Sequence, residues 1–147
     1  MSWEYSENIL VQNSAGKVLK EKLGWEVVFA YNTEVLGDSG TLGRKSYKEI
    51  VLTRYLRQAL FDNNDWMTEE YADSAVKTLC AYTASATLMQ INEEKYSMLR
   101  DGIPVQVKKD DGTFENRNAL VFNFAEPEKN HFLAVKDDDA EKQFGAL

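Results

Sequence analysis

The segment WEVVFAY, residues 25–31, constrains the fold most, because its apolar residues follow one another without alternation. Val27, Val28 and Phe29 form the centre of this run. A strand that is buried on both faces has such a pattern, and strands of that kind are typical of parallel sheets covered by helices. The segment therefore predicts a buried strand in a domain that also contains helices.

The residues before this strand have the spacing of a helix, which we expect from about Ser6 to Leu23. Ser6 can cap the free amide groups of the first turn, and Glu7 suits the positive end of the helix dipole. Gly24 is placed to end the helix. One apolar stripe runs along it, formed by Val11, Ala15, Val18 and Leu19.

Further helical patterns follow a loop at residues 32–46, which has three glycines but lacks the Lys-Ser/Thr end of a phosphate-binding P-loop. The second helix is expected from Tyr47 to about Phe61, and a third begins near Thr68. A short helical piece at residues 91–102 ends at a glycine. The buried side of the third helix is expected at Ala75, Leu79, Tyr82 and Ala86.

The period then changes from that of helices to that of strands. Residues 103–108, IPVQVK, alternate as a strand does, and the Asp-Gly of KDDGTF favours a tight hairpin turn. Two more strands are expected at residues 118–124 and 131–135. The order of helix, strand, helices and several strands predicts a mixed α/β or α+β fold.

Composition narrows the class of protein. A chain of 147 residues fits one domain, and no stretch approaches the roughly 18 apolar residues of a membrane span. The net charge of −7 argues against a generic basic nucleic-acid coat, although the field that matters for binding is local. The single cysteine, Cys80, is expected to be a small buried apolar residue, and its lack of a partner favours a cytoplasmic protein.

Basic residues gather between positions 44 and 57, where Glu49 is the only acid. They form either the solvated face of a helix or a surface that meets a DNA backbone. The residues of this cluster are Arg44, Lys45, Lys48, Arg54 and Arg57.

No complete active site can be read from the residues alone. His131 is the only histidine and is expected at a strand edge. One histidine and one cysteine argue against a transition-metal site of the His/Cys type. No nucleophile elbow is present. The acids of KDDD, residues 136–139, point in different directions if they lie in a strand or tail, which favours a solvated acidic tail over a metal site.

Four segments in order resemble a known family. They are YSEN with VLKEKLGWEVVFAYNTEVLG, TLGRKSYKEIVLTRYLRQAL, INEEKYSMLRDGIPVQV, and VFNFAEPEKNHFLAV. Together they are similar to the N-terminal nuclease region of the restriction (R) subunit of type I restriction-modification enzymes, over about residues 5–135.

The resemblance implies a PD-(D/E)xK nuclease domain joined to an ATP-driven DNA translocase. Such subunits work with methyltransferase and specificity subunits and cut non-self double-stranded DNA with Mg²⁺. Many nucleases of this class carry an acid on the first helix near the metal site, and Glu7 occupies the matching place. Under this reading Arg44, Lys45, Arg54 and Arg57 are the expected DNA contacts.

The sequence departs from the family after NHFLAV, where the family continues to an Asp on one strand and a Glu-x-Lys on the next. Here the chain reads KDDDAEKQFGAL, in which Glu141 and Lys142 are adjacent. We therefore expect a part of the nuclease domain at residues 1–135 and an acidic tail at 136–147, which together do not cut DNA. An uncovered sheet edge would favour self-association.

Two other functions stay open at this point. The chain could be a non-catalytic module for DNA binding or subunit assembly that uses the same fold. It could also be an unrelated small enzyme with carboxylate chemistry.

Overall fold

The computed structural model describes residues 11–30 and 34–136, and the mixed fold of helices and strands is confirmed. The chain forms two compact units. Unit 1 comprises the residues up to Lys45 and those from His131 onward, whereas unit 2 is the continuous segment Ser46–Asn130. Unit 2 is therefore an insertion between two parts of unit 1.

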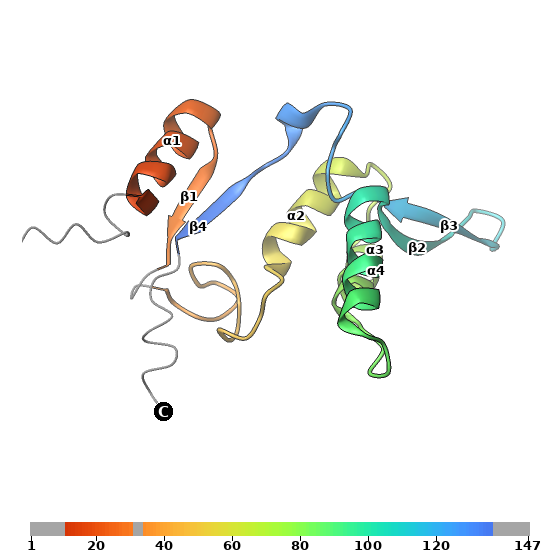
Figure 1. Cartoon of the computed structure of the whole chain (residues 1–147). Coiled ribbons are helices and arrows are strands. Elements are labelled where there is room, and N and C mark those ends of the chain that lie inside the picture. The colour runs from red at the N-terminus through yellow and green to blue at the C-terminus, as the bar shows by residue number, and fades with distance from the viewer. Residues whose placement is uncertain (1–10, 31–33, 137–147) are drawn as a thin grey trace, which may run out of the picture. The chain divides into compact units, whose positions relative to one another are not determined.

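Unit 1 is built on a pair of parallel strands that are distant in sequence. Helix α1 (Asn13–Leu23) leads into strand β1 (Glu26–Phe29), which pairs with strand β4 (Leu133–Lys136). Helix α1 packs against both strands, as Figure 1 shows. Immediately before the strands, the rings of Trp25 and Phe132 stack with their centroids 5.0 Å apart. The strand predicted from WEVVFAY is thus confirmed, and its partner runs parallel to it.

The burial of unit 1 is lower than its sequence suggested. Val27 and Val28 are half-buried rather than fully buried. In the described part of unit 1, α1 is the one helix on the strand pair, and β1 and β4 have only each other as neighbours. Two residues of the predicted apolar stripe, Val11 and Val18, are exposed, whereas Leu19 is half-buried.

The end of α1 is where the sequence placed it. Gly24 adopts a left-handed conformation with φ of 68°, which a glycine reaches without the steric cost of a side chain. The Trp25 amide donates to the Leu19 carbonyl at 3.1 Å and closes the last turn. Ser6 and Glu7, the expected start of the helix, lie outside the described residues.

Unit 2 consists of three helices and a β-hairpin, and contains the main apolar core (Figure 1). The hairpin is antiparallel, and its first strand buries every second residue. No helix in the described part of the chain is long and apolar enough to span a bilayer. The elements are α2 (Thr53–Asn63), α3 (Glu69–Cys80), α4 (Leu88–Asp101), β2 (Ile103–Lys108), β3 (Phe114–Ala119) and the short 3-10 helix η2 (Pro127–Lys129).

The core of unit 2 forms where the helices meet strand β2. Ile103, Val105 and Val107 project from one face of that strand and are buried. Helices α3 and α4 pack against β2, and α2 packs against α3. The helices contribute Leu56, Leu60, Ala72, Ala75, Leu79 and Met98.

Local capping fixes the ends of these helices. Thr68 caps α3, as its sequence predicted, and its hydroxyl accepts a hydrogen bond from the Tyr71 amide. Gly102 ends α4, also as predicted, with φ of 103°. A Cβ atom there would lie 2.8 Å from the Cβ of Asn118, so this close approach of two chain segments requires glycine.

Three helix boundaries were predicted wrongly. Helix α4 begins at Leu88 rather than at residue 91, and the other two boundaries differ by more. Helix α2 begins at Thr53 rather than at Tyr47, and the residues between form bends and turns in which Ile50 is 93% exposed. The apolar spacing of Ile50 therefore does not reflect burial. Helix α3 ends at Cys80, so Tyr82 lies beyond it and is 70% exposed. Cys80 is itself exposed, which corrects the expectation of a buried thiol.

The second hairpin strand was also misplaced. It was expected at residues 118–124 but spans Phe114–Ala119. The reason is the tight turn, in which the Lys109 amide donates to the Thr113 carbonyl at 2.7 Å, so pairing resumes directly after Gly112. Because β3 exposes most of its side chains, its sequence is polar and gives no apolar alternation.

A buried asparagine joins the end of α2 to the segment after β3. Asn64 is 5% exposed, and its side-chain amide donates to the Leu60 carbonyl at 2.8 Å and to the Leu120 carbonyl at 2.9 Å. Its side-chain oxygen accepts from the Leu120 amide at 2.9 Å. The Asn64 side chain therefore hydrogen-bonds to both the amide and the carbonyl of Leu120.

We predict that Asn64→Ala lowers the free energy of unfolding by about 2 kcal/mol, because both Leu120 backbone groups lose their partner. Urea unfolding followed by circular dichroism measures the change. Asn116→Ala is the matched control, because Asn116 is exposed on β3, and it should change stability by less than about 0.5 kcal/mol. Equal effects of the two substitutions would contradict the role given to Asn64.

Candidate functional site

The predicted catalytic acid and the acidic tail cannot be placed in this structure. Glu7 and the acids at 137–139 lie outside the described residues. The predicted basic cluster is described in full, and it is divided between the two units. Arg44 and Lys45 belong to unit 1, whereas Arg54 and Arg57 are on helix α2 of unit 2.

Arg44 forms a buried ion pair within the loop that follows β1. Its Nε and Nη2 atoms donate to the two carboxylate oxygens of Glu34 at 2.6 and 2.7 Å. The side chains of Arg44 and Glu34 are only 10% and 2% exposed. Two parallel hydrogen bonds of this kind fix the geometry of the guanidinium as well as its charge. The contact thus holds together the two ends of the loop between residues 34 and 44.

The glycines of this loop allow close contacts between its backbone segments, which do not form a phosphate-binding turn. A Cβ atom on Gly40 would lie 1.9 Å from the carbonyl oxygen of Val35, so the chain crosses itself too closely for any side chain. The Thr41 amide donates to the same Val35 carbonyl at 2.9 Å, and the Thr41 hydroxyl accepts from the Val35 amide at 2.9 Å. The Gly37 amide donates to the Arg44 carbonyl at 2.9 Å, which completes a compact loop.

The other predicted DNA contacts have different surroundings. Lys45 lies 3.8 Å from Asp38, and both side chains are largely exposed. The guanidinium of Arg54 lies 5.2 Å from the ring centroid of Tyr55. Arg57 forms ion pairs with Glu69 and Asp73 of helix α3. Burial alone would lower the pKa of Arg57, but these two carboxylates outweigh it and raise the pKa. Arg57 thus also links two helices.

The described residues offer no ready metal site. No group of three or more His, Cys, Asp or Glu side chains converges in the described part of the chain. His131 lies just before β4, and its Nε2 is 2.6 Å from a carboxylate oxygen of Glu26 on β1. Glu93 and Lys95 have the spacing of Glu-x-Lys but are on helix α4, where Lys95 donates to the carbonyls of Thr78 and Ala81.

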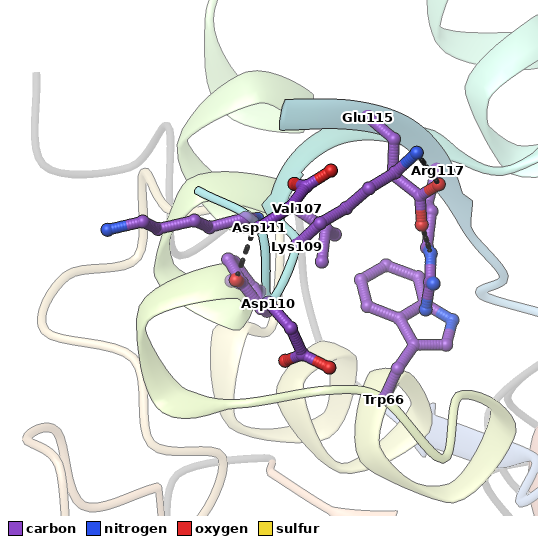
Figure 2. A pocket seen from close by; sticks show the side chains of 9 residues that line it. Trp66, Val107, Lys109, Asp110, Asp111, Glu115 and Arg117 are labelled. Atoms are coloured by element: carbon purple, nitrogen blue, oxygen red, sulfur yellow. Dashed lines mark hydrogen bonds and ion pairs between the residues drawn. The ribbon is translucent and has the colours of Figure 1, made fainter. Parts of the chain in front are cut away.

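Unit 2 contains a polar pocket that the sequence did not reveal. Its volume is about 590 Å³, and it lies between the start of α3 and the β2–β3 hairpin. Figure 2 shows the ring of Trp66 on one side and the Asp110 carboxylate on the other. Tyr71 also lines the pocket, with its ring centroid 6.2 Å from that of Trp66, and its hydroxyl accepts from the Lys108 amide at 3.1 Å. Two aromatic rings are therefore held at the base of a charged hairpin.

Two carboxylates around the pocket, those of Glu115 and Asp111, have close partners. The Arg117 guanidinium lies 5.6 Å from the Trp66 ring centroid and also forms an ion pair with Glu115. The hydrogen bond from Arg117 lowers the pKa of Glu115, and Lys109, whose Nζ is 3.5 Å from Glu115, adds to the effect. The Thr113 hydroxyl and amide likewise lower the pKa of Asp111. These carboxylates therefore stay ionised to a lower pH than unperturbed aspartate and glutamate side chains.

The comparisons with known proteins match one family over almost the whole chain. The model of the type I restriction enzyme R protein N terminus matches residues 4–140. The chain belongs to this family. A relative named as the type I restriction enzyme MjaIXP endonuclease subunit, from Methanocaldococcus jannaschii, is 26% identical over 136 residues. That match covers 92% of this chain and 12% of the relative. No solved structure matches.

The family assignment confirms the resemblance that the sequence indicated. The pocket, in contrast, was not predicted from the sequence and is seen only in the structure. In this R protein N terminus the pocket combines Trp66, which precedes α3, with residues near 108–117, more than 40 positions away. The local signals were the aromatic pair Trp66 and Tyr71 and the paired charges of KKDD at 108–111. Nothing in the sequence pattern indicates that these two segments meet.

We predict that Arg44→Met destabilises unit 1 by about 3–5 kcal/mol, because Glu34 is left charged and buried without its partner. Hydrogen exchange of the β1 amides measures the free energy of opening. The double variant Glu34→Leu with Arg44→Met should recover most of the loss, because it removes both charges. Lys45→Met is the control and should have little effect, since Lys45 and Asp38 are exposed. A harmless Arg44→Met would contradict the structural role of the pair.

The ion pair at Glu115 predicts a defined dependence of stability on pH. Because the folded-state pKa of Glu115 is lowered, its contribution is present above the usual glutamate pKa of about 4.3 and is lost as the pH falls through the folded value. The stability difference between the native chain and Glu115→Gln should therefore be constant near neutral pH and shrink below about pH 4. Urea midpoints across pH measure it. Glu93→Gln, an exposed change on α4, should give a small difference at every pH.

Proposed function

We propose that this chain supplies the N-terminal part of the nuclease region in an R subunit that cleaves double-stranded DNA. The complete subunit would act in a Mg²⁺- and ATP-dependent complex with methyltransferase and specificity subunits, in the cytoplasm where its DNA substrate lies. The family match over residues 4–140 carries this proposal. A PD-(D/E)xK fold is also proposed, and the helix and parallel strands of unit 1 are compatible with it.

We further propose that this chain alone does not cleave DNA. In nucleases of the proposed class, carboxylates hold Mg²⁺, which activates water and stabilises the leaving oxygen. The described residues do not converge into such a set of ligands, so no step through the metal is assigned to them. Glu7 remains the proposed catalytic acid of the complete subunit.

The proposed contact with duplex DNA is the basic cluster at residues 44–57. Arg54 and Arg57 lie on α2, and Lys45 is largely exposed on unit 1. Arg44 and Arg57 already hold carboxylates of the chain, so their contact with a phosphate would compete with these ion pairs. Because Arg54 and Lys45 are exposed whereas the side chain of Arg44 is only 10% exposed, we expect Arg54 and Lys45 to contribute more to binding than Arg44 does.

A second candidate function is subunit assembly without catalysis. The ion pairs of Arg44 and Arg57 favour it, because they give both residues a structural role. In the described part of the chain, β1 and β4 pair only with each other, which leaves an outer edge on each strand. Such edges can accept a further strand, from a partner or from a second copy of the chain.

We predict that the affinity of the chain for a short DNA duplex falls steeply with salt, and that Arg54→Ala with Arg57→Ala flattens the slope. Each lost phosphate contact should reduce the slope of log K against log salt by about 0.9. Fluorescence anisotropy at several salt concentrations measures it, and circular dichroism verifies folding.

The matched control for this experiment is Lys17→Ala with Lys20→Ala. These lysines are exposed on helix α1, outside the cluster. Their replacement removes the same total charge as the replacement of Arg54 and Arg57. The control should keep the native slope. Equal slopes for both double variants would show that only net charge matters and would remove the cluster from the proposal.

A further inference from the structure

The pocket of unit 2 has features that a planar ligand with a charged backbone would use. It combines a volume of about 590 Å³ with two aromatic rings and both signs of charge. Pockets of this volume accommodate small organic groups. The groups that line it come from the start of α3 and from the hairpin, which are joined by the Tyr71 hydroxyl and the Lys108 amide. The pocket is therefore a built feature of unit 2.

The aromatic side of the pocket is suited to stacking. Trp66 is only partly buried, so part of its ring is accessible from the pocket. Arg117 lies over the same ring and is itself held by Glu115. Aromatic and guanidinium groups arranged in this way bind the faces of nucleobases, irrespective of the base.

The polar side of the pocket carries groups that can contact the phosphates of a nucleotide and the amino group of its base. Lys108 and Lys109 lie at the end of β2 and the start of the turn, where they can contact phosphates. Asp110 lies opposite Trp66 at the other side of the pocket (Figure 2). A carboxylate accepts hydrogen bonds from exocyclic amino groups, as in the contact of Asp or Glu with the N4 of cytosine.

The geometry points to a binding site for an unstacked nucleotide of single-stranded DNA. The base would lie against Trp66 with its amino group on Asp110. The adjacent phosphates would lie near Lys108 and Lys109. The choice of DNA as ligand rests on the proposed function. In a duplex the faces of the bases are covered by their neighbours, so this pocket would act only on a strand that is open or displaced. The site consists of other residues than the proposed duplex contact at residues 44–57.

The test compares a labelled single-stranded oligonucleotide with the duplex of the same sequence by fluorescence anisotropy. Trp66→Leu, which keeps an apolar side chain beside the core, should weaken single-strand binding at least about fivefold and leave duplex binding unchanged. Lys108→Ala, an exposed change with little risk to folding, should weaken single-strand binding and flatten its salt slope. Phe114→Leu and Lys77→Ala are the matched controls, because both residues are exposed outside the pocket, and both should be neutral.

Asp110→Ala gives the sharpest readout. Loss of a negative charge alone would strengthen binding to every oligonucleotide. The inference instead expects a loss of preference for oligo-dC over oligo-dT, because thymine has no amino group for the carboxylate. An unchanged base preference would overturn the role of Asp110.

The remaining outcomes separate this inference from the proposed function. Duplex binding that depends on Arg54 and Arg57, together with single-strand binding that ignores Trp66 and Lys108, would overturn the pocket and leave the proposed function intact. Binding of a cationic peptide that Lys108→Ala strengthens, with no binding of single strands, would assign the pocket to a protein partner and also overturn it. Single-strand binding through Trp66 without duplex binding would support the pocket and contradict the duplex contact on α2.

Discussion

The pairing of β1 with β4 is the interaction on which the rest of the structure depends. It joins residues 26–29 to residues 133–136, so the whole of unit 2 must leave unit 1 after β1 and return to it before β4. Parallel pairing requires such a long crossover, because the chain must travel back to the starting end of the sheet. The stacked rings of Trp25 and Phe132 and the contact of His131 with Glu26 lie where the returning chain meets β1.

Unit 2 is held together in another way, through a buried core and polar contacts between distant segments. The apolar face of β2 packs on α3 and α4, while Asn64 holds the chain after β3. The hairpin is thereby fixed relative to α3, with the Tyr71 hydroxyl on the Lys108 amide as a further link. The pocket lies between these two elements.

Local signals in the sequence predicted the parts of this fold that depend on neighbouring residues. Gly24, Thr68 and Gly102 mark helix ends because their conformations or side chains act within one turn. Predictions failed where burial depends on distant packing. Ile50 and Tyr82 have helical spacing but are exposed to solvent. Strand β3 has no apolar pattern because most of its side chains are exposed. The site was harder still, since the carboxylate partners of Arg44 and Arg57 and the two sides of the pocket come from separate segments.

The central proposal is that this R protein N terminus engages DNA but does not cut it by itself. The most direct measurement incubates the chain with supercoiled plasmid at low salt, with Mg²⁺ or with EDTA, and follows binding and strand breaks on one gel series. The account predicts a retarded plasmid that remains supercoiled under both conditions. Nicking that requires Mg²⁺ and is abolished by Glu7→Gln would contradict it, because the chain would then hold a complete catalytic site.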